Sequence, residues 1–273
     1  MDFQLSECRV RIAIPEDKAD LLRVAKGIWG GTDYLPKVVD RWISEPWFWV
    51  CEYRSRVIAC LKMTLFPDNV LWFEGLRVHV RYQNHGIATL MNHSSFDLAR
   101  RLRTENPKMR YEFCTYYQNV ESLHLTHKLG FGIVEKFYDL RKHGIKATRE
   151  PRILKNIDLK LFHNYPSYIP CSWQSVHNTP ASIPFLKRHG SVFRTPQAAY
   201  YLGGLHEPSI TLLEPPTPSI KDDLPYFQHF FGSRKTYGVI LPQAWRDYLP
   251  LLQQYGFRFW DKEVVENMLV LQM

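Results

Sequence analysis

The 273-residue chain has no hydrophobic run of the roughly 18 residues that a transmembrane helix needs. Its first residues have neither the basic segment nor the apolar segment of a secretory signal, so we expect a cytoplasmic protein. The five cysteines form no Cys-x-x-Cys pair, and neither they nor the eleven histidines show metal-ligand spacing. We therefore predict reduced thiols, no bound metal and no membrane association.

A long basic run is also missing, although the formal net charge is +8. The densest cluster of basic residues, 100–103, closes a helical pattern, where cations complement the negative end of the helix dipole. We therefore do not expect nucleic acid as a partner. The oligomeric state cannot be read from the sequence.

The chain has the composition of a globular protein, with 45% hydrophobic, 14% aromatic and 23% charged residues. Its length suits one large domain or two modest ones. The polar, basic segment 142–156 contains Gly144 and Pro151 and is typical of a linker. We therefore predict one domain over residues 1–150 and a second, smaller α/β domain over 151–273.

Hydrophobic periodicity over residues 9–140 predicts the order β-α-α-β-β-β-α-β-α-β. In the second half it predicts three strands and two helices, over residues 198–202, 210–213, 239–241, 221–231 and 244–255. Gly130-Phe131 and Gly256-Phe257 each follow a predicted helix and precede a predicted strand. The recurrence is either a coincidence or the trace of a degraded second copy of the first half.

Residues 83–88, which include Gly86, connect a predicted strand to a predicted helix and are typical of a phosphate-binding site. Free backbone N–H groups and the positive end of a helix suit a pyrophosphate there. Gly86 lets the backbone approach closely, and Ala88 leaves the helix start uncrowded. The stretch has neither a P-loop Gly-Lys-Ser/Thr nor a Gly-x-Gly, which argues against a nucleotide triphosphatase and a dinucleotide fold. The alternative is a plain strand-to-helix connection.

Residues 76–88 resemble motif A of the GCN5-related N-acetyltransferase (GNAT) superfamily, and residues 119–122 with 128–131 resemble its motif B. The predicted order of elements matches as well. The resemblance implies an α/β fold with a mixed, mostly antiparallel sheet flanked by helices, and acetyl-CoA as cosubstrate. It also implies direct attack by a small-molecule primary amine in a ternary complex. Residues 33–36 and 74–78 are similar to the histidine N-acetyltransferase-like subgroup, which acetylates the α-amine of a free amino acid.

The same resemblance assigns roles to individual residues. The backbone N–H groups of Val78 and Val80 would hold the pantetheine arm, and that of Val78 would polarise the thioester carbonyl. The remaining cofactor contacts would come from Gln83, Asn84, His85, Gly86, Ile87, Ala88 and, in motif B, Asn119.

Acetyl transfer needs a neutral amine, so a base must take the proton of the ammonium group. Glu74 is a charged residue in an aromatic and apolar strand, at a position where many family members carry such a carboxylate. Its alternative is a residue on the solvated face of the strand. The acceptor would contact Trp29, Asp33 and Tyr34, unless Asp33 only caps the next helix.

Thr126 departs from the family pattern, because a Tyr that protonates the leaving thiolate often occupies this position. Two alternatives therefore stay open beside acetylation of a small amine. One is a protein or peptide N-acetyltransferase, and the other is a non-catalytic acyl-CoA-binding regulatory module. The C-terminal half has no second stretch like residues 83–88, so we expect it to bind no second acetyl-CoA.

Overall fold

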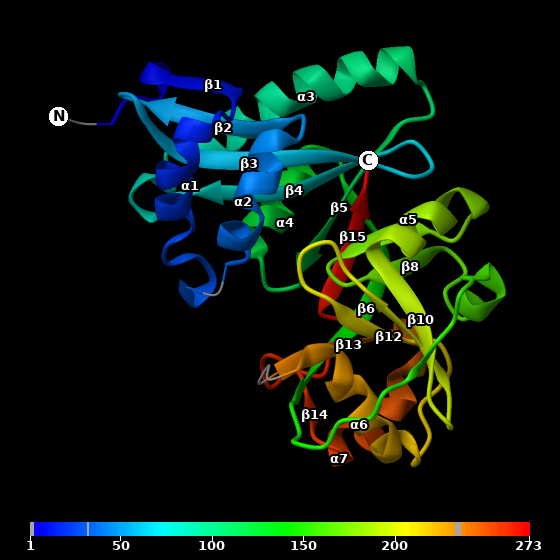
Figure 1. The fold of residues 1–273 in the computed structure, drawn as a ribbon. Helices are drawn as coiled ribbons and strands as arrows, with labels where there is room; N and C mark the ends of the chain where they lie inside the picture. Colours follow the sequence, from blue (N-terminus) through cyan, green and yellow to red (C-terminus); the bar gives the residue numbers. More distant parts are fainter. Residues whose placement is uncertain (1–2, 32, 233–235) are drawn as a thin grey trace. The chain divides into compact units, whose positions relative to one another are not determined.

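The computed structural model describes residues 3–31, 33–232 and 236–273, without the side chain of Trp29 (Figure 1). The chain forms two compact units, residues 1–113 and 114–273. The division falls inside strand β5 (Arg110–Tyr116), whereas the sequence places the domain boundary at 142–156.

The order of elements predicted for residues 9–140 is confirmed. Along the chain it is β1 (Cys8–Ile12), α1 (Lys18–Ala25), α2 (Leu35–Ser44), β2 (Phe48–Tyr53), β3 (Arg56–Phe66), β4 (Val70–Val78), α3 (Ile87–Glu105), β5, α4 (Val120–Lys128) and β6 (Gly132–His143).

The sheet of the first unit has the order β1-β2-β3-β4-β5, antiparallel except for the parallel pair β4–β5. Apolar residues of α1 and α2 at helical spacing, such as Leu21 and Trp42, form a buried cluster with Phe48 and Cys60. Phe73 stacks on Phe96 of α3, with ring centroids 5.3 Å apart. Helices therefore contribute to the packing of both sheet faces.

Strand β4 contains a β-bulge at Gly75. Arg77 pairs with Cys60 and Glu74 pairs with Lys62, so two residues of β4 lie opposite one residue of β3. Gly75 has φ +71°, and a Cβ there would lie 2.6 Å from the buried ring of Trp42. The parallel pairing with β5 covers only Val70–Trp72, so β4 continues past the bulge without β5 as its partner.

The second unit continues with short strands around another core. After β6 come β7 (Arg152–Ile153), β8 (Tyr168–Cys171), β9 (Gln174–His177), α5 (Ile183–His189), β10 (Gly190–Arg194), β11 (Ala199–Gly203), β12 (Ser209–Leu212), α6 (Ile220–Phe231), β13 (Thr236–Pro242), α7 (Leu249–Gln254), β14 (Phe257–Arg258) and β15 (Met268–Gln272).

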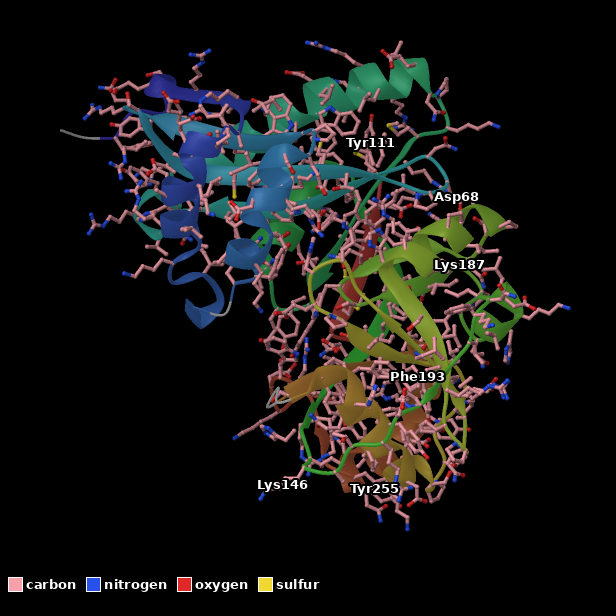
Figure 2. All side chains as sticks on the ribbon, viewed as in Figure 1. Asp68, Tyr111, Lys146, Lys187, Phe193 and Tyr255 are labelled. Carbon is pink, nitrogen blue, oxygen red and sulfur yellow. The ribbon has the colours of Figure 1, made fainter. Side chains whose placement is uncertain are left out.

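The main sheet of this unit contains the order β15-β6-β13-β12-β11-β10-β7, and β14 also pairs with β6. Strands β8 and β9 form a separate hairpin. Phe193, labelled in Figure 2, is wholly buried in the core beneath α6. The helix predicted over 244–255 is interrupted: a 3-10 segment, Gln243–Tyr248, precedes α7, because Pro250 suits only the first turn of a new helix.

The second unit repeats a connection of the first. Strands β10, β11 and β12 pair antiparallel, and α6 then leads to β13, which is parallel to β12. Strands β2, β3 and β4 with α3 and β5 have the same arrangement. Gly256-Phe257 precedes β14 as Gly130-Phe131 precedes β6. This topology supports a degraded second copy.

Replacing Gly75 with Ala should destabilise the first unit by about 2–4 kcal/mol, because a Cβ adds backbone strain and collides with Trp42. Gly132→Ala is the control, since its Cβ meets no atom within 4 Å. Denaturant unfolding should shift for the first variant and stay within about 0.5 kcal/mol for the second. Equal shifts would contradict the role of the bulge.

Candidate functional site

The end of β4 exposes backbone groups that β3 does not use. The N–H of His79 donates to the carbonyl of Ile58 at 2.8 Å, which makes Val78 and Ala59 a non-hydrogen-bonded pair. The N–H and C=O of Val78 therefore face away from β3. The carbonyl accepts a hydrogen bond from Gln83 Nε2 at 3.1 Å, and the N–H faces the edge of β4 beyond the β5 pairing.

Val80 and residues 83–88, which we call the cradle, follow directly after Val78. Val80 is 51% exposed and begins a 3-10 turn, Val80–Tyr82, which His79 Nδ1 caps by accepting from the N–H of Arg81. Asn84 and Gly86 have φ of 63° and 78°, and His85 Nδ1 lies 2.6 Å from the carbonyl oxygen of Gln83. The predicted cofactor residues Val78, Val80 and 83–88 thus run from the last residue of β4, through these turns, to the first two residues of α3.

The N-terminus of helix α3, at Ile87, has the features of an anion-binding site. Gly86 is its N-cap residue, no side chain caps it, and no acidic residue occupies its first turn. The first N–H groups of a helix have no intrahelical acceptor, and a 19-residue helix has a positive N-terminal end. Left-handed residues before the helix add to such a concavity of N–H groups. The geometry suits a diphosphate.

Glu74 lies on β4 just before the bulge and is half-buried. Thr64 Oγ1 donates to its carboxylate at 3.0 Å. Directly opposite, the Lys62 ammonium is buried and donates to the carbonyls of Pro46 and Met63 at 2.9 and 2.8 Å. Burial lowers the pKa of Lys62, while nearby carboxylates including Glu74 oppose this shift. The carboxylate therefore has a fixed hydrogen-bond donor and a neighbouring amine.

Asp33 and Tyr34 pack around an arginine that the sequence analysis did not single out. Both Asp33 carboxylate oxygens bond to Arg77, at 2.7 and 3.1 Å, and one also accepts the N–H of Leu35 at 3.1 Å. The Arg77 guanidinium lies 5.1 Å from the centre of the Tyr34 ring, and burial raises the pKa of that phenol.

Asp33 thus accepts from the first N–H of α2, although Tyr34 and not Asp33 is the N-cap residue. Its contact with an acceptor stays a prediction. The side chain of Trp29 lies outside the described residues. Arg77 was missed, although a charged residue within an apolar strand is the same signal that singled out Glu74.

Asn119, Thr126 and the neighbouring tyrosines belong to the second unit. Asn119 precedes α4 and donates to Thr115 Oγ1 at 2.9 Å, while the Thr126 hydroxyl donates to the carbonyl of Ser122 at 2.7 Å. The phenols of Tyr116 and Tyr117 both donate to Asp261. Burial and this carboxylate raise the pKa of both phenols, so they are poor proton donors.

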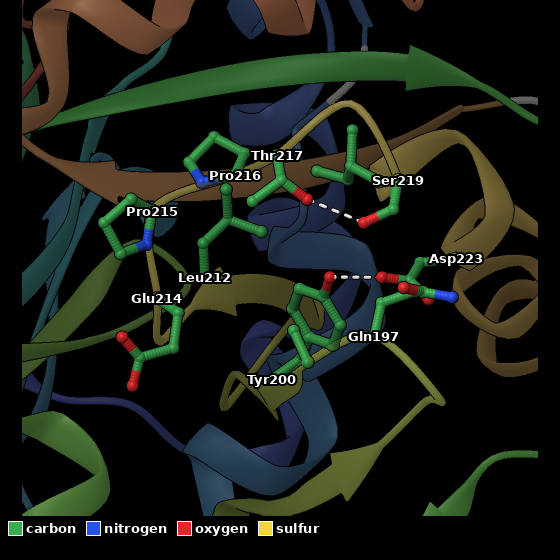
Figure 3. Close-up of a pocket in the computed structure, with 11 residues that line it drawn as sticks. Gln197, Tyr200, Leu212, Glu214, Pro215, Pro216, Thr217, Ser219 and Asp223 are labelled. Carbon is green, nitrogen blue, oxygen red and sulfur yellow. Dashed lines mark hydrogen bonds between the residues drawn. The ribbon is translucent and has the colours of Figure 1, made fainter.

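The second unit also contains a small cavity of about 140 Å³ at the start of α6 (Figure 3). Leu212 and Ile220 contribute apolar walls, and Tyr200, Glu214 and Asp223 contribute polar groups. The Tyr200 hydroxyl donates to Asp223 at 2.5 Å, and burial raises the pKa of this carboxyl. None of the residues predicted from the sequence lies here.

Over residues 3–31, 33–232 and 236–273, no three His, Cys, Asp or Glu side chains are grouped to hold a metal ion. No helix in this part of the chain is both long and apolar enough to cross a membrane.

Comparison with known proteins completes the picture. Residues 20–131 match the family model described as acetyltransferase (GNAT) family. A proposed acetyltransferase from Thermoplasma acidophilum is 15% identical, with a TM-score of 0.64 over 97% of this chain and 99% of that one. A GCN5-related N-acetyltransferase from Sphaerobacter thermophilus is 10% identical, with a TM-score of 0.64 over 98% and 95%. These likenesses show a shared fold. No curated protein matches the chain significantly.

Asp33→Asn should destabilise the first unit by about 3–5 kcal/mol, because it leaves the Arg77 charge buried without its partner. The amide keeps an oxygen for the N–H of Leu35, so the change isolates the ion pair. Asp97→Asn, which breaks an exposed pair with Arg100, should cost less than about 1 kcal/mol. Denaturant unfolding measures both, and a similar small loss in each would show that the Asp33 pair is not structural.

Proposed function

Because residues 20–131 are an acetyltransferase domain of the GNAT family, which transfers acetyl groups from acetyl-CoA, we propose that this chain acetylates the α-amine of a free amino acid such as histidine. The observation that carries the proposal is the edge of β4. The N–H of Val78 points away from β3, and a few residues later α3 begins without a side-chain cap, so one segment offers donors for both a thioester and a diphosphate.

The residues present fit acetyl-CoA. The N–H groups of Val78 and Val80 hold the pantetheine arm, and the backbone of residues 83–88 holds the diphosphate. A side chain at Gly86 would obstruct the cradle and crowd Leu5, whose Cδ2 lies 3.3 Å from the added Cβ.

Glu74 takes the proton of the acceptor ammonium, directly or through water. The amine nitrogen then bonds to the thioester carbon, and the N–H of Val78 stabilises the oxyanion that develops. The C–S bond breaks as the carbonyl re-forms, coenzyme A leaves as a thiolate, and the nitrogen gives its second proton to water. Water gives the thiolate its proton, because the Thr126 hydroxyl is committed within its helix and the two phenols are poor acids.

A free amino acid is supported by the similarity of residues 33–36 and 74–78 to the histidine-acetylating subgroup. Asp33 and Tyr34 form one wall of the acceptor site, and Arg77 fixes both in place. A small-molecule acceptor in the cytoplasm follows from this assignment. Thr126 favours one other function, an acyl-CoA-binding regulatory module without turnover.

Residues 151–273 take no part in cofactor binding in this proposal. The connection from β12 to α6 corresponds to the one from β4 to α3, but it contains Pro215, Pro216 and Pro218, which have no N–H to offer. Two acidic residues, Asp222 and Asp223, occupy the first turn of α6 and would repel a phosphate.

A thiol-release assay tests the function. Purified protein and acetyl-CoA are incubated with pooled amino acids, polyamines or peptides, and free coenzyme A is measured. Release with one or more amino acids supports the proposal, and release with peptides alone overturns the substrate assignment. Acetyl-CoA binding without release in any pool indicates the regulatory module.

Gly86→Glu should weaken acetyl-CoA binding at least about tenfold, since the side chain blocks the approach of the diphosphate and repels its charge. Calorimetry of the wild type should show one acetyl-CoA per chain. Gly232→Glu is the matched control, because Gly232 also has a positive φ and open space around it. Unchanged affinity in Gly86→Glu, or two cofactors per chain, would overturn the cradle assignment.

Glu74→Gln should lower the rate at neutral pH by roughly 10²–10⁴. Raising the pH should recover part of the loss, because more of the acceptor amine is then neutral without a base. The exposed Glu105 at the end of α3 supplies the control, Glu105→Gln. A Glu74→Gln enzyme with the rate and pH profile of the wild type would make Glu74 a structural residue.

A further inference from the structure

The cavity at the start of α6 occupies the place in the second unit that the cradle occupies in the first. Each lies where the third strand of an antiparallel trio turns into a helix that crosses to a parallel strand. The cavity is lined by residues of β11, β12, the connecting loop and the first turn of α6 (Figure 3). The cavity is therefore a candidate ligand site at the position equivalent to the cradle, and its lining residues decide which ligand it suits.

The charge at this position is reversed. Residues 87–89 at the start of α3 include no acid, whereas α6 begins with Asp222 and Asp223 in its first turn. Of these two acids only Asp223 lines the cavity, and Glu214 adds a second carboxylate to its lining. Glu214 also lies 4.0 Å from the ring of His163. The two lining carboxylates favour a cation over a phosphate.

Asp223 gives the cavity an unused acceptor. The residue is wholly buried, and one carboxylate oxygen accepts from Tyr200. Its other oxygen, Oδ1, makes no hydrogen bond with the described residues. The hydroxyl of Thr195 is nearby but bonds to the carbonyl of Ala198 at 3.3 Å. A buried oxygen without a donor is costly, and a ligand N–H would satisfy it.

The size and the apolar walls of the cavity indicate what the ligand carries besides its N–H group. Leu212, Ile220, Pro215 and Ala198 give it apolar sides. Its volume of about 140 Å³ is close to the roughly 150 Å³ that accommodates one benzene molecule in an engineered cavity. The ligand therefore has about five or six non-hydrogen atoms.

We propose that this cavity binds a small alkylammonium ion, with its ammonium group on Asp223 and its alkyl chain against Leu212 and Ile220. The site is distinct from the acetyl-CoA cradle and does not depend on acetyl transfer by the chain.

Calorimetry on the full chain without acetyl-CoA tests the site with n-butylammonium and with 1-butanol, which has the same number of non-hydrogen atoms but no charge. The ammonium ion should bind at least about tenfold more tightly than the alcohol. Asp223→Asn should reduce this ratio to below about threefold. Asp222→Asn, which changes the exposed neighbour in the same helical turn, should leave the ratio unchanged.

Two further variants separate this site from the acceptor site and from misfolding. Glu74→Gln should keep the binding, because Glu74 lies in the first unit. Ala198→Leu should abolish binding of both probes by filling the cavity, with an unfolding midpoint near that of the wild type. Equal affinity of the wild type for the two probes, or an undiminished ratio in Asp223→Asn, would overturn the proposal. Loss of binding in Glu74→Gln, or tighter binding of inorganic phosphate, would also overturn it.

Discussion

The bulge at Gly75 determines where the functional groups of the first unit point. In a regular strand, residues three apart face opposite sides of the sheet. The additional residue makes Glu74 and Arg77 face the same side, because they pair with Lys62 and Cys60, which are two apart on β3. One glycine beneath Trp42 therefore places the proposed base beside the Arg77–Asp33 pair. The same irregularity precedes the N–H of Val78, on an edge of β4 that no longer pairs with β5.

The order of elements could be predicted because hydrophobic periodicity and the strand–glycine–helix connection are local features. Strand β4 ends at Val78, and its internal glycine, Gly75, was the sequence signal available for the bulge. The contacts between Asp33 and Arg77, 44 residues apart, and between Tyr116 and Asp261, 145 apart, left no local trace. Such pairs are decided by tertiary packing, which the periodicity of a single chain does not encode.

The two units show how the loop before a helix decides what a common topology binds. A glycine in the left-handed region and an acid-free first turn leave N–H groups and positive potential at α3. Prolines and two aspartates remove the donors and reverse the potential at α6. The two units share an arrangement of strands and crossover helix and differ in the loop before that helix. The cavity at Asp223 lies at this loop in the second unit.

In the proposed reaction, a side chain removes the proton of the acceptor, whereas no side chain is assigned to protonate the leaving thiolate. Glu74 removes a proton from the acceptor at a site with its own hydrogen-bond donor, Thr64. For the leaving thiolate, the hydroxyl of Thr126 is bonded to its own helix, and Tyr116 donates to a carboxylate that raises its pKa. A thiolate can leave without an acid when water reaches it, since a thiol is itself moderately acidic. The reaction therefore depends on deprotonating the amine, and the rate should follow the protonation state of the acceptor more than that of a tyrosine.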